Sequence, residues 1–203
     1  MNPLNSVKGS IATGFVVAVI IGITLSMSGP LGVSVFNVVA LGRWLHIISG
    51  VMWIGLLYYF NVVQVPGLAA AAADAGGPGG AGISKYIAPR ALWWFRWAAV
   101  VTWVTGAYYL LNGYGSYEAI HNAFSLQPSF RTIGVGAWLG TIMLFNVWVL
   151  IWPNQKKVLG IVPATDEQKA TARRVALLAS RTNFVLSIPM LMCMAGQSHG
   201  LPF

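Results

Sequence analysis

The sequence is poor in charge and in the side chains that catalyse reactions without help. Of its 203 residues only 8% are charged and 57% are hydrophobic, whereas soluble domains carry about 25% charged residues. This shortage excludes an ordinary water-soluble domain and predicts a polytopic membrane protein. The basic residues, which give a net charge of +8, form no compact basic face, so we expect no nucleic-acid partner.

Cysteine and acidic residues are also scarce. The only cysteine, Cys193, lies in an apolar run, which excludes an internal disulfide, a cysteine metal site and the C-x-x-C-H motif of covalent haem. With three histidines and four acidic residues, any chemistry of this chain is expected to depend on a bound cofactor.

Long apolar segments predict an all-α membrane helix bundle, treated as a single transmembrane domain over residues 1–203. About 20 apolar residues suffice to cross a bilayer, and the predicted spans are residues 10–28, 41–64, 92–112, 132–152 and 176–198. A cleaved signal peptide is the alternative for the first segment, but no A-x-A-like site follows it, so we expect an uncleaved span.

The segments between the spans have distinct compositions. Residues 29–40 are expected to be a short connection, and residues 65–91, rich in Ala, Gly and Pro, a flexible loop. The sequence TDEQ at residues 165–168 is a capping-box pattern that predicts a helix start. Gly136 and Gly140 have the small-xxx-small spacing that favours close helix packing.

The basic residues fall unevenly on the two sides of a five-span bundle. Ten are on one side and only Arg43 and Arg131 are on the other, which predicts a cytoplasmic N-terminus and a periplasmic C-terminus in a bacterial inner membrane. The ten are Lys8, Lys85, Arg90, Arg96, Lys156, Lys157, Lys169, Arg173, Arg174 and Arg181.

His46 lies inside the second predicted span and shares one helical stripe with Gly50 and Trp53. An ionisable residue within a span indicates a functional site. Gly50 leaves room for a flat, bulky group beside the imidazole, which suggests a porphyrin. The alternative is that His46 bonds a neighbouring helix.

A second histidine, His199, is predicted at the same membrane depth, at the end of the fifth span. Two histidines on different helices can ligate one haem iron from both sides, so we expect His46 and His199 to bind one non-covalent haem b. Arg43 and Arg131 are the expected partners of its propionates, and His121 is the reserve ligand. Otherwise His199 merely ends the last helix.

Polar residues also gather near the opposite membrane face. A site for a planar polar ligand or quinone is one interpretation of them, and ordinary interhelical hydrogen bonding is the other. These residues are Asn61, Arg96, Asn146, Arg181 and Asn183.

Several segments together resemble the membrane domain of the bacterial membrane-anchored urate hydroxylase, the urate oxidase N-terminal family. They are RWLHIISGVMWIGLLYYFNVVQVP (43–66), ALWWFRWAA (91–99), FNVWVLIWPNQKKVLG (145–160), SRTNFVLSIPMLMCM (180–194) and the final SH (198–199). The resemblance implies the same helical membrane fold. It also marks as candidate functional positions His46, Arg96, Asn146, Trp152, Arg181, Asn183 and His199.

Family members of the full type carry a C-terminal c-type cytochrome domain, which this sequence lacks. We therefore expect a haem-binding electron-transfer protein that passes electrons to an external cytochrome-type partner, with oxidoreductase activity of the urate-hydroxylase type left open. The alternative function is a non-catalytic accessory subunit of a larger respiratory or photosynthetic complex. Homo-oligomerisation also stays open.

Overall fold

A computed structural model describes residues 2–27, 37–115 and 117–202, and this part of the chain contains helices and no strands. The predicted all-α fold is confirmed. The chain divides into two compact units, residues 1–38 and 39–203. Residue 28 of the first predicted span and most of the predicted connection 29–40 lie outside the described residues.

The first unit contains η1 (Pro3–Asn5) and α1 (Val7–Met27). The second contains α2 (Val38–Tyr58), η2 (Tyr59–Gln64), α3 (Val65–Ala73), η3 (Ile83–Ile87), α4 (Ala88–Asn112), α5 (Glu118–Phe124), η4 (Pro128–Phe130), α6 (Arg131–Phe145), η5 (Asn146–Ile151), α7 (Trp152–Val158) and α8 (Asp166–His199).

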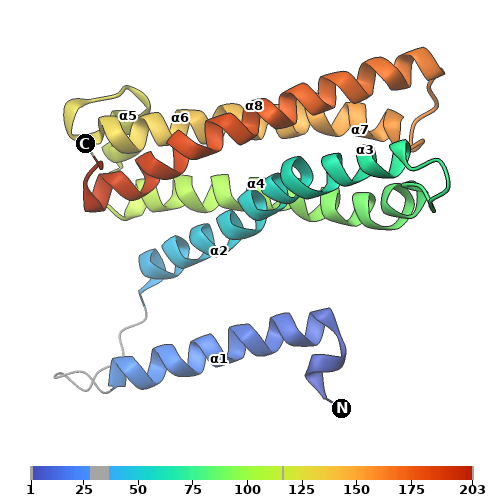
Figure 1. Ribbon diagram of the computed structural model, residues 1–203. Coiled ribbons are helices and arrows are strands. Elements are labelled where there is room, and N and C mark those ends of the chain that lie inside the picture. Colours follow the sequence, from blue (N-terminus) through green and yellow to red (C-terminus); the bar gives the residue numbers. More distant parts are fainter. Residues whose placement is uncertain (1, 28–36, 116, 203) are drawn as a thin grey trace. The chain divides into compact units, whose positions relative to one another are not determined.

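Within the second unit the long helices run back and forth between two ends (Figure 1). At one end, here called the histidine end, α2 and α6 begin while α4 and α8 finish, and α5 lies there too. The opposite, basic end holds most of the cationic residues, namely Lys85, Arg90, Arg96, Lys156, Lys157, Lys169, Arg173 and Arg174. The helix α8 packs along α6, η5 and α7.

Among the described residues, four helical stretches are long and apolar enough to cross a membrane: Val7–Met27, Val38–Ala73, Pro128–Val158 and Asp166–His199. The chain is therefore a membrane protein in contact with lipid. The predicted span 92–112 forms most of α4 but is not among these four. Its tryptophans and tyrosines and Arg96 lower its mean hydropathy, as interfacial residues do.

The predicted flexible loop at 65–91 is largely wrong. Residues 65–73 continue the second span as α3, and residues 83–87 form η3, which leads directly into α4. The run of alanines from Ala69 has the highest helix propensity of any residue type. Pro66 stands in the first turn of α3, where its missing N–H does not interrupt a hydrogen bond.

Each of the π-helical turns η2, η3 and η5 is followed two residues later by a proline. These prolines are Pro66, Pro89 and Pro153, each in the first turn of the next α-helix. A proline inside a continuous helix clashes with the carbonyl four residues earlier. The wider π turn relieves that clash, which lets the long helices pass each proline without ending.

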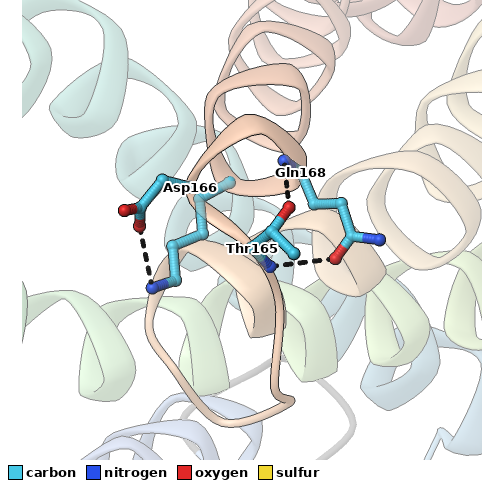
Figure 2. Close-up of polar contacts among 4 residues, drawn as sticks. Thr165, Asp166 and Gln168 are labelled. Atoms are coloured by element: carbon cyan, nitrogen blue, oxygen red, sulfur yellow. Dashed lines mark hydrogen bonds and ion pairs between the residues drawn. The ribbon is translucent and has the colours of Figure 1, made fainter.

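The start of α8 is fixed as the sequence predicts. Figure 2 shows the Thr165 hydroxyl accepting from the Gln168 N–H (3.3 Å) while Gln168 Oε1 accepts from the Thr165 N–H (3.0 Å). Lys169 also bridges to Asp166 at 3.4 Å. This reciprocal cap satisfies backbone donors at the helix start and sets the register of α8, which ends at His199.

The core of the second unit is built where α2, α4, α6 and α8 meet. Its most buried side chains are Trp53, Leu57, Phe95, Met143 and Val147, each no more than 2% exposed. On the α6–α8 contact, a Cβ on Gly136 would lie 3.1 Å from the Cβ of Cys193. That close approach confirms the packing predicted from Gly136, whereas Gly140 has a different environment, described below.

Candidate functional site: a cavity at the histidine end

A cavity of about 780 Å³ lies between α2, α4, α6 and α8. It falls in the size range of small-molecule and cofactor sites, about 300–1,000 Å³. Most of its lining is apolar, as is usual for such sites. Five of the six residues predicted to bind a cofactor line this single cavity: Arg43, His46, Gly50, Trp53 and His199.

His46 is held against α4 by its side-chain nitrogen. Its Nδ1 lies 2.7 Å from the backbone oxygen of Thr102. A carbonyl oxygen can only accept, so Nδ1 carries the proton and Nε2 keeps a free lone pair. Metal-ligating histidines are commonly oriented by this kind of second bond. Part of the bland interpretation, a bond to a neighbouring helix, is therefore also correct.

Gly106 makes the position of His46 possible. A Cβ at Gly106 would lie 2.8 Å from His46 Cε1 and 2.9 Å from Nδ1, so any larger residue there would displace the ring. By contrast, a Cβ at Gly50 would meet only Thr102 Cγ2, at an ordinary 3.7 Å. The glycine that shapes the imidazole site is Gly106 on α4, which the sequence analysis missed.

His199 reaches the cavity from the end of α8, together with Ala195 and Ser198. Its side chain is exposed, and within residues 37–115 and 117–202 it has no hydrogen-bond partner. Both ring nitrogens are therefore available to a ligand in the cavity.

The rim near His46 is polar. The guanidinium of Arg43 lies 5.9 Å from the centre of the Tyr109 ring, and Arg43, Tyr109 and Tyr114 all line the cavity. Burial raises the pKa of Tyr114, and the neighbouring Tyr109 adds to this shift. Tyr114 therefore keeps its hydroxyl proton at neutral pH and presents a donor beside the Arg43 cation.

Two predicted residues lie elsewhere. Arg131 begins α6 as an exposed residue and is not among those that line the cavity. His121, the reserve ligand, is exposed on the short helix α5 and also lies outside the lining. The structure thus supplies Arg43, but not Arg131, to a ligand in the cavity.

The deep part of the cavity, here called the floor, is lined by Trp53, Gly140 and Met190. Gly140 is buried, yet no described heavy atom lies within 4 Å of where its Cβ would be. The predicted tight helix contact at Gly140 is therefore wrong, because this glycine faces the cavity instead.

The polar residues predicted near the other face are mostly bonded to one another. Asn146 Nδ2 donates to Asn183 Oδ1 (2.8 Å), and Asn183 Nδ2 donates to the Met143 oxygen (2.9 Å). The guanidinium of Arg96 stacks on Trp152, 3.8 Å from the ring centre, whereas Arg181 is exposed. Asn146 and Asn183 are thus interhelical contacts of the buried core, and the set does not converge on one site.

Thr102, Gly106 and Tyr114 contribute to the site without having been predicted. The sequence does contain a signal for the first two, because Thr102 and Gly106 are four residues apart and so lie on one face of a helix. Only the pairing of α4 with α2 shows that this face meets His46.

Residues 115–203 match the family model described as urate oxidase N-terminal. No curated protein and no solved structure matches the chain. The matched region covers α5 to α8 and includes His199 and the α6 and α8 walls of the cavity, whereas His46 lies before it. This match supports membership of the chain in the urate oxidase N-terminal family, as a urate-oxidase-related membrane domain.

Proposed function

We propose that this membrane domain binds one non-covalent haem b in the cavity at the histidine end and transfers electrons through it. The observation that carries the proposal is the shared cavity of His46 and His199, with the Nδ1 of His46 already bonded to a backbone carbonyl. The family resemblance is compatible with this role, since it implies redox chemistry on a purine.

The chain's own residues would divide the work of holding the group. His46 and His199 would supply the two axial nitrogens, with the bond to Thr102 fixing the ring of His46. Gly50 leaves space for the macrocycle beside α2. Arg43 and Tyr114 would bind propionate oxygens at the rim, the former as a cation and the latter as a neutral donor. When bound, haem supplies one-electron redox chemistry.

Electrons would leave at the histidine end. His199 is exposed there, so a ligated haem would have one edge close to the surface of the protein. A c-type cytochrome docked at this end is the proposed partner. The excess of basic residues at the opposite end places the histidine end in the periplasm of a bacterial inner membrane, under the positive-inside rule.

The test is a reduced-minus-oxidised absorption spectrum of purified protein expressed with ample haem. We expect a Soret band and a sharp low-spin alpha band in the wild type. His46→Ala and His199→Ala should each lower bound haem more than about tenfold or convert it to a high-spin form. His121→Ala is the matched control, because that histidine is exposed and outside the cavity lining; it should retain wild-type haem.

Each outcome has a defined meaning. A wild-type protein that binds no haem would overturn the proposal and favour an accessory membrane subunit instead. A low-spin band that survives in one histidine variant would remove that residue from the axial pair. Loss of the band in His121→Ala but not in His199→Ala would transfer the second ligand position to α5.

A further inference from the structure

The contact between α2 and α8 contains polar groups in a row, here called the seam. From the cavity floor towards the basic end they are Trp53 and Tyr58 on α2 and Asn61 and Gln64 on η2; α8 contributes Ser180 and Ser187 opposite them. The Tyr58 hydroxyl and Ser187 Oγ are hydrogen-bonded at 3.2 Å, and Asn61 Nδ2 donates to Ser180 Oγ at 2.9 Å.

Three atoms of the seam are buried and have no hydrogen-bond partner in the described chain: Trp53 Nε1, Asn61 Oδ1 and Gln64 Oε1. They are called the seam atoms below. A buried polar atom left without a partner costs about 1–3 kcal/mol, so native proteins usually supply ordered water to such atoms. Exchanging the two amide atoms of Asn61 does not help, because its oxygen would then face the Leu57 carbonyl that its nitrogen now binds at 2.8 Å.

The spacing of these groups matches the reach of water. At a rise of 1.5 Å per residue, Trp53, Tyr58, Asn61 and Gln64 follow one another at intervals of about 4.5–7.5 Å. One water bridging two groups spans about 5.5–6 Å, twice an ordinary hydrogen-bond length. One or two waters per interval would therefore join the groups into a continuous row about 16 Å long.

The two ends of this row are at informative places. Trp53 lines the cavity floor, and Gln64 is the last residue of η2, towards the basic end. Between them Ser187 is fully buried (0% exposed) but Ser180 and Tyr58 are only partly so. The row therefore connects the cavity to the membrane face that is opposite the histidine end.

Another helix provides an internal control. Trp53-x-Gly55-x4-Phe60-Asn61-Val62 on α2 recurs as Trp138-x-Gly140-x4-Phe145-Asn146-Val147 on α6. On α6 the same polar atoms are bonded: Trp138 Nε1 donates to the Phe124 oxygen (2.9 Å) and Asn146 to Asn183. The fold can therefore satisfy this motif with protein groups alone. On α2 it does not, which indicates that the seam atoms serve something other than packing.

We propose that the α2–α8 seam is a water-filled route that carries protons between the basic end and the cavity floor. Its ligand is water, bound by Trp53 Nε1, the Tyr58 and Ser187 hydroxyls, Asn61 Oδ1 and Gln64 Oε1. This inference rests on the seam contacts alone and stands whether or not the cavity holds haem.

The test is hydrogen–deuterium exchange of indole N–H groups, followed by NMR of ¹⁵N-tryptophan-labelled protein in lipid nanodiscs. Trp53 and Trp103 both line the cavity, but the N–H of Trp103 donates to Thr141 Oγ1 at 2.9 Å. We expect the Trp53 indole, on a residue only 2% exposed, to exchange at least about tenfold faster than that of Trp103, because a single unpaired bond to mobile water opens more readily than a bond to protein.

Variants locate the water entry. Asn61→Leu should slow Trp53 exchange at least fivefold, and Val62→Leu is the matched control, since Val62 is the adjacent residue and is 60% exposed. If Asn61→Leu fails to fold, Ser187→Ala tests the same row from α8. Trp53 exchange as slow as that of Trp103 would overturn the proposal. So would unchanged Trp53 exchange in both seam variants, because water would then enter by the cavity mouth.

Discussion

The helices α2 and α6 carry the same motif, W-x-G-x4-F-N-V, followed by a π-helical turn and a proline, but they are used differently. On α6 the motif packs: Asn146 and Val147 are buried against α8, and Trp138 bonds to the end of α5. On α2 the motif leaves space: Trp53 lines the cavity floor, and Asn61 has only one of its two amide atoms bonded to protein.

The difference lies in what each helix faces. Seven residues before the motif tryptophan, α2 has His46, bonded to α4 and lining the cavity, whereas α6 has the exposed Arg131. One local sequence therefore supports two roles, with α6 and α8 forming a rigid wall and α2 carrying the polar groups that the cavity uses. Shared motif residues indicate a shared backbone conformation, and their partners decide the function.

The largest effect is expected at the motif glycine of α6, Gly140. Its Cβ direction opens into the cavity, so Gly140→Leu should fill the floor and lower bound haem at least about tenfold, equivalent to roughly 1.4 kcal/mol. Gly140→Ala adds one carbon and should lower it less than about twofold. Haem content is measured by the pyridine haemochrome spectrum.

Thermal stability of the haem-free protein is the control for these variants. Because the new side chain enters open space, the unfolding temperature should not fall in either one. A Gly140→Leu protein with full haem content would show that the floor is not part of the cofactor site.

A smaller effect is expected from the two motif asparagines. Asn146→Ala removes the donor to Asn183 Oδ1, on a residue that is 0% exposed, and should lower the free energy of unfolding by about 1–3 kcal/mol. Asn61→Ala also removes an unpaired oxygen and should cost less than half as much. Unfolding of both variants in mixed detergent micelles, followed by circular dichroism, gives the two values. Equal losses would mean that the two asparagines have equivalent surroundings.

Much of this architecture follows from local sequence, because apolar runs, prolines and caps act within a few residues. The span around His46, the cap at Thr165 and the helix ending at His199 were all predictable for that reason. The shared cavity of His46 and His199 was predicted too, because alternating spans fix which helix ends lie at the same membrane depth.

Other features depended on contacts between helices that no local pattern reports. Residues 65–73 look like a loop by composition, yet Pro66 falls in the first turn of a continuing helix and the alanines favour it. Gly140 has packing spacing, but whether its face meets α8 or a cavity depends on the rotation of α6. Gly106 acts only because α4 places it against His46. The seam is visible only when the partners of Asn61 and Asn146 are compared.

The smallest effect is expected from the two motif tryptophans. Trp138→Phe removes the N–H that joins α6 to the Phe124 oxygen at the end of α5, a hydrogen bond worth about 0.5–1.5 kcal/mol. The loss should fall mainly on α5, a helix of only seven residues, and raise amide exchange at Ser125 and Leu126 by about two- to tenfold. Trp53→Phe removes an indole N–H that is a seam atom, so the volume lost is offset by removal of a buried donor, and α5 should exchange as in the wild type. Mass-spectrometric exchange of the peptide spanning α5 distinguishes the two variants. Faster α5 exchange in Trp53→Phe would show that α2 supports α5 through the cavity, and the division of labour between the two motif helices would then be wrong.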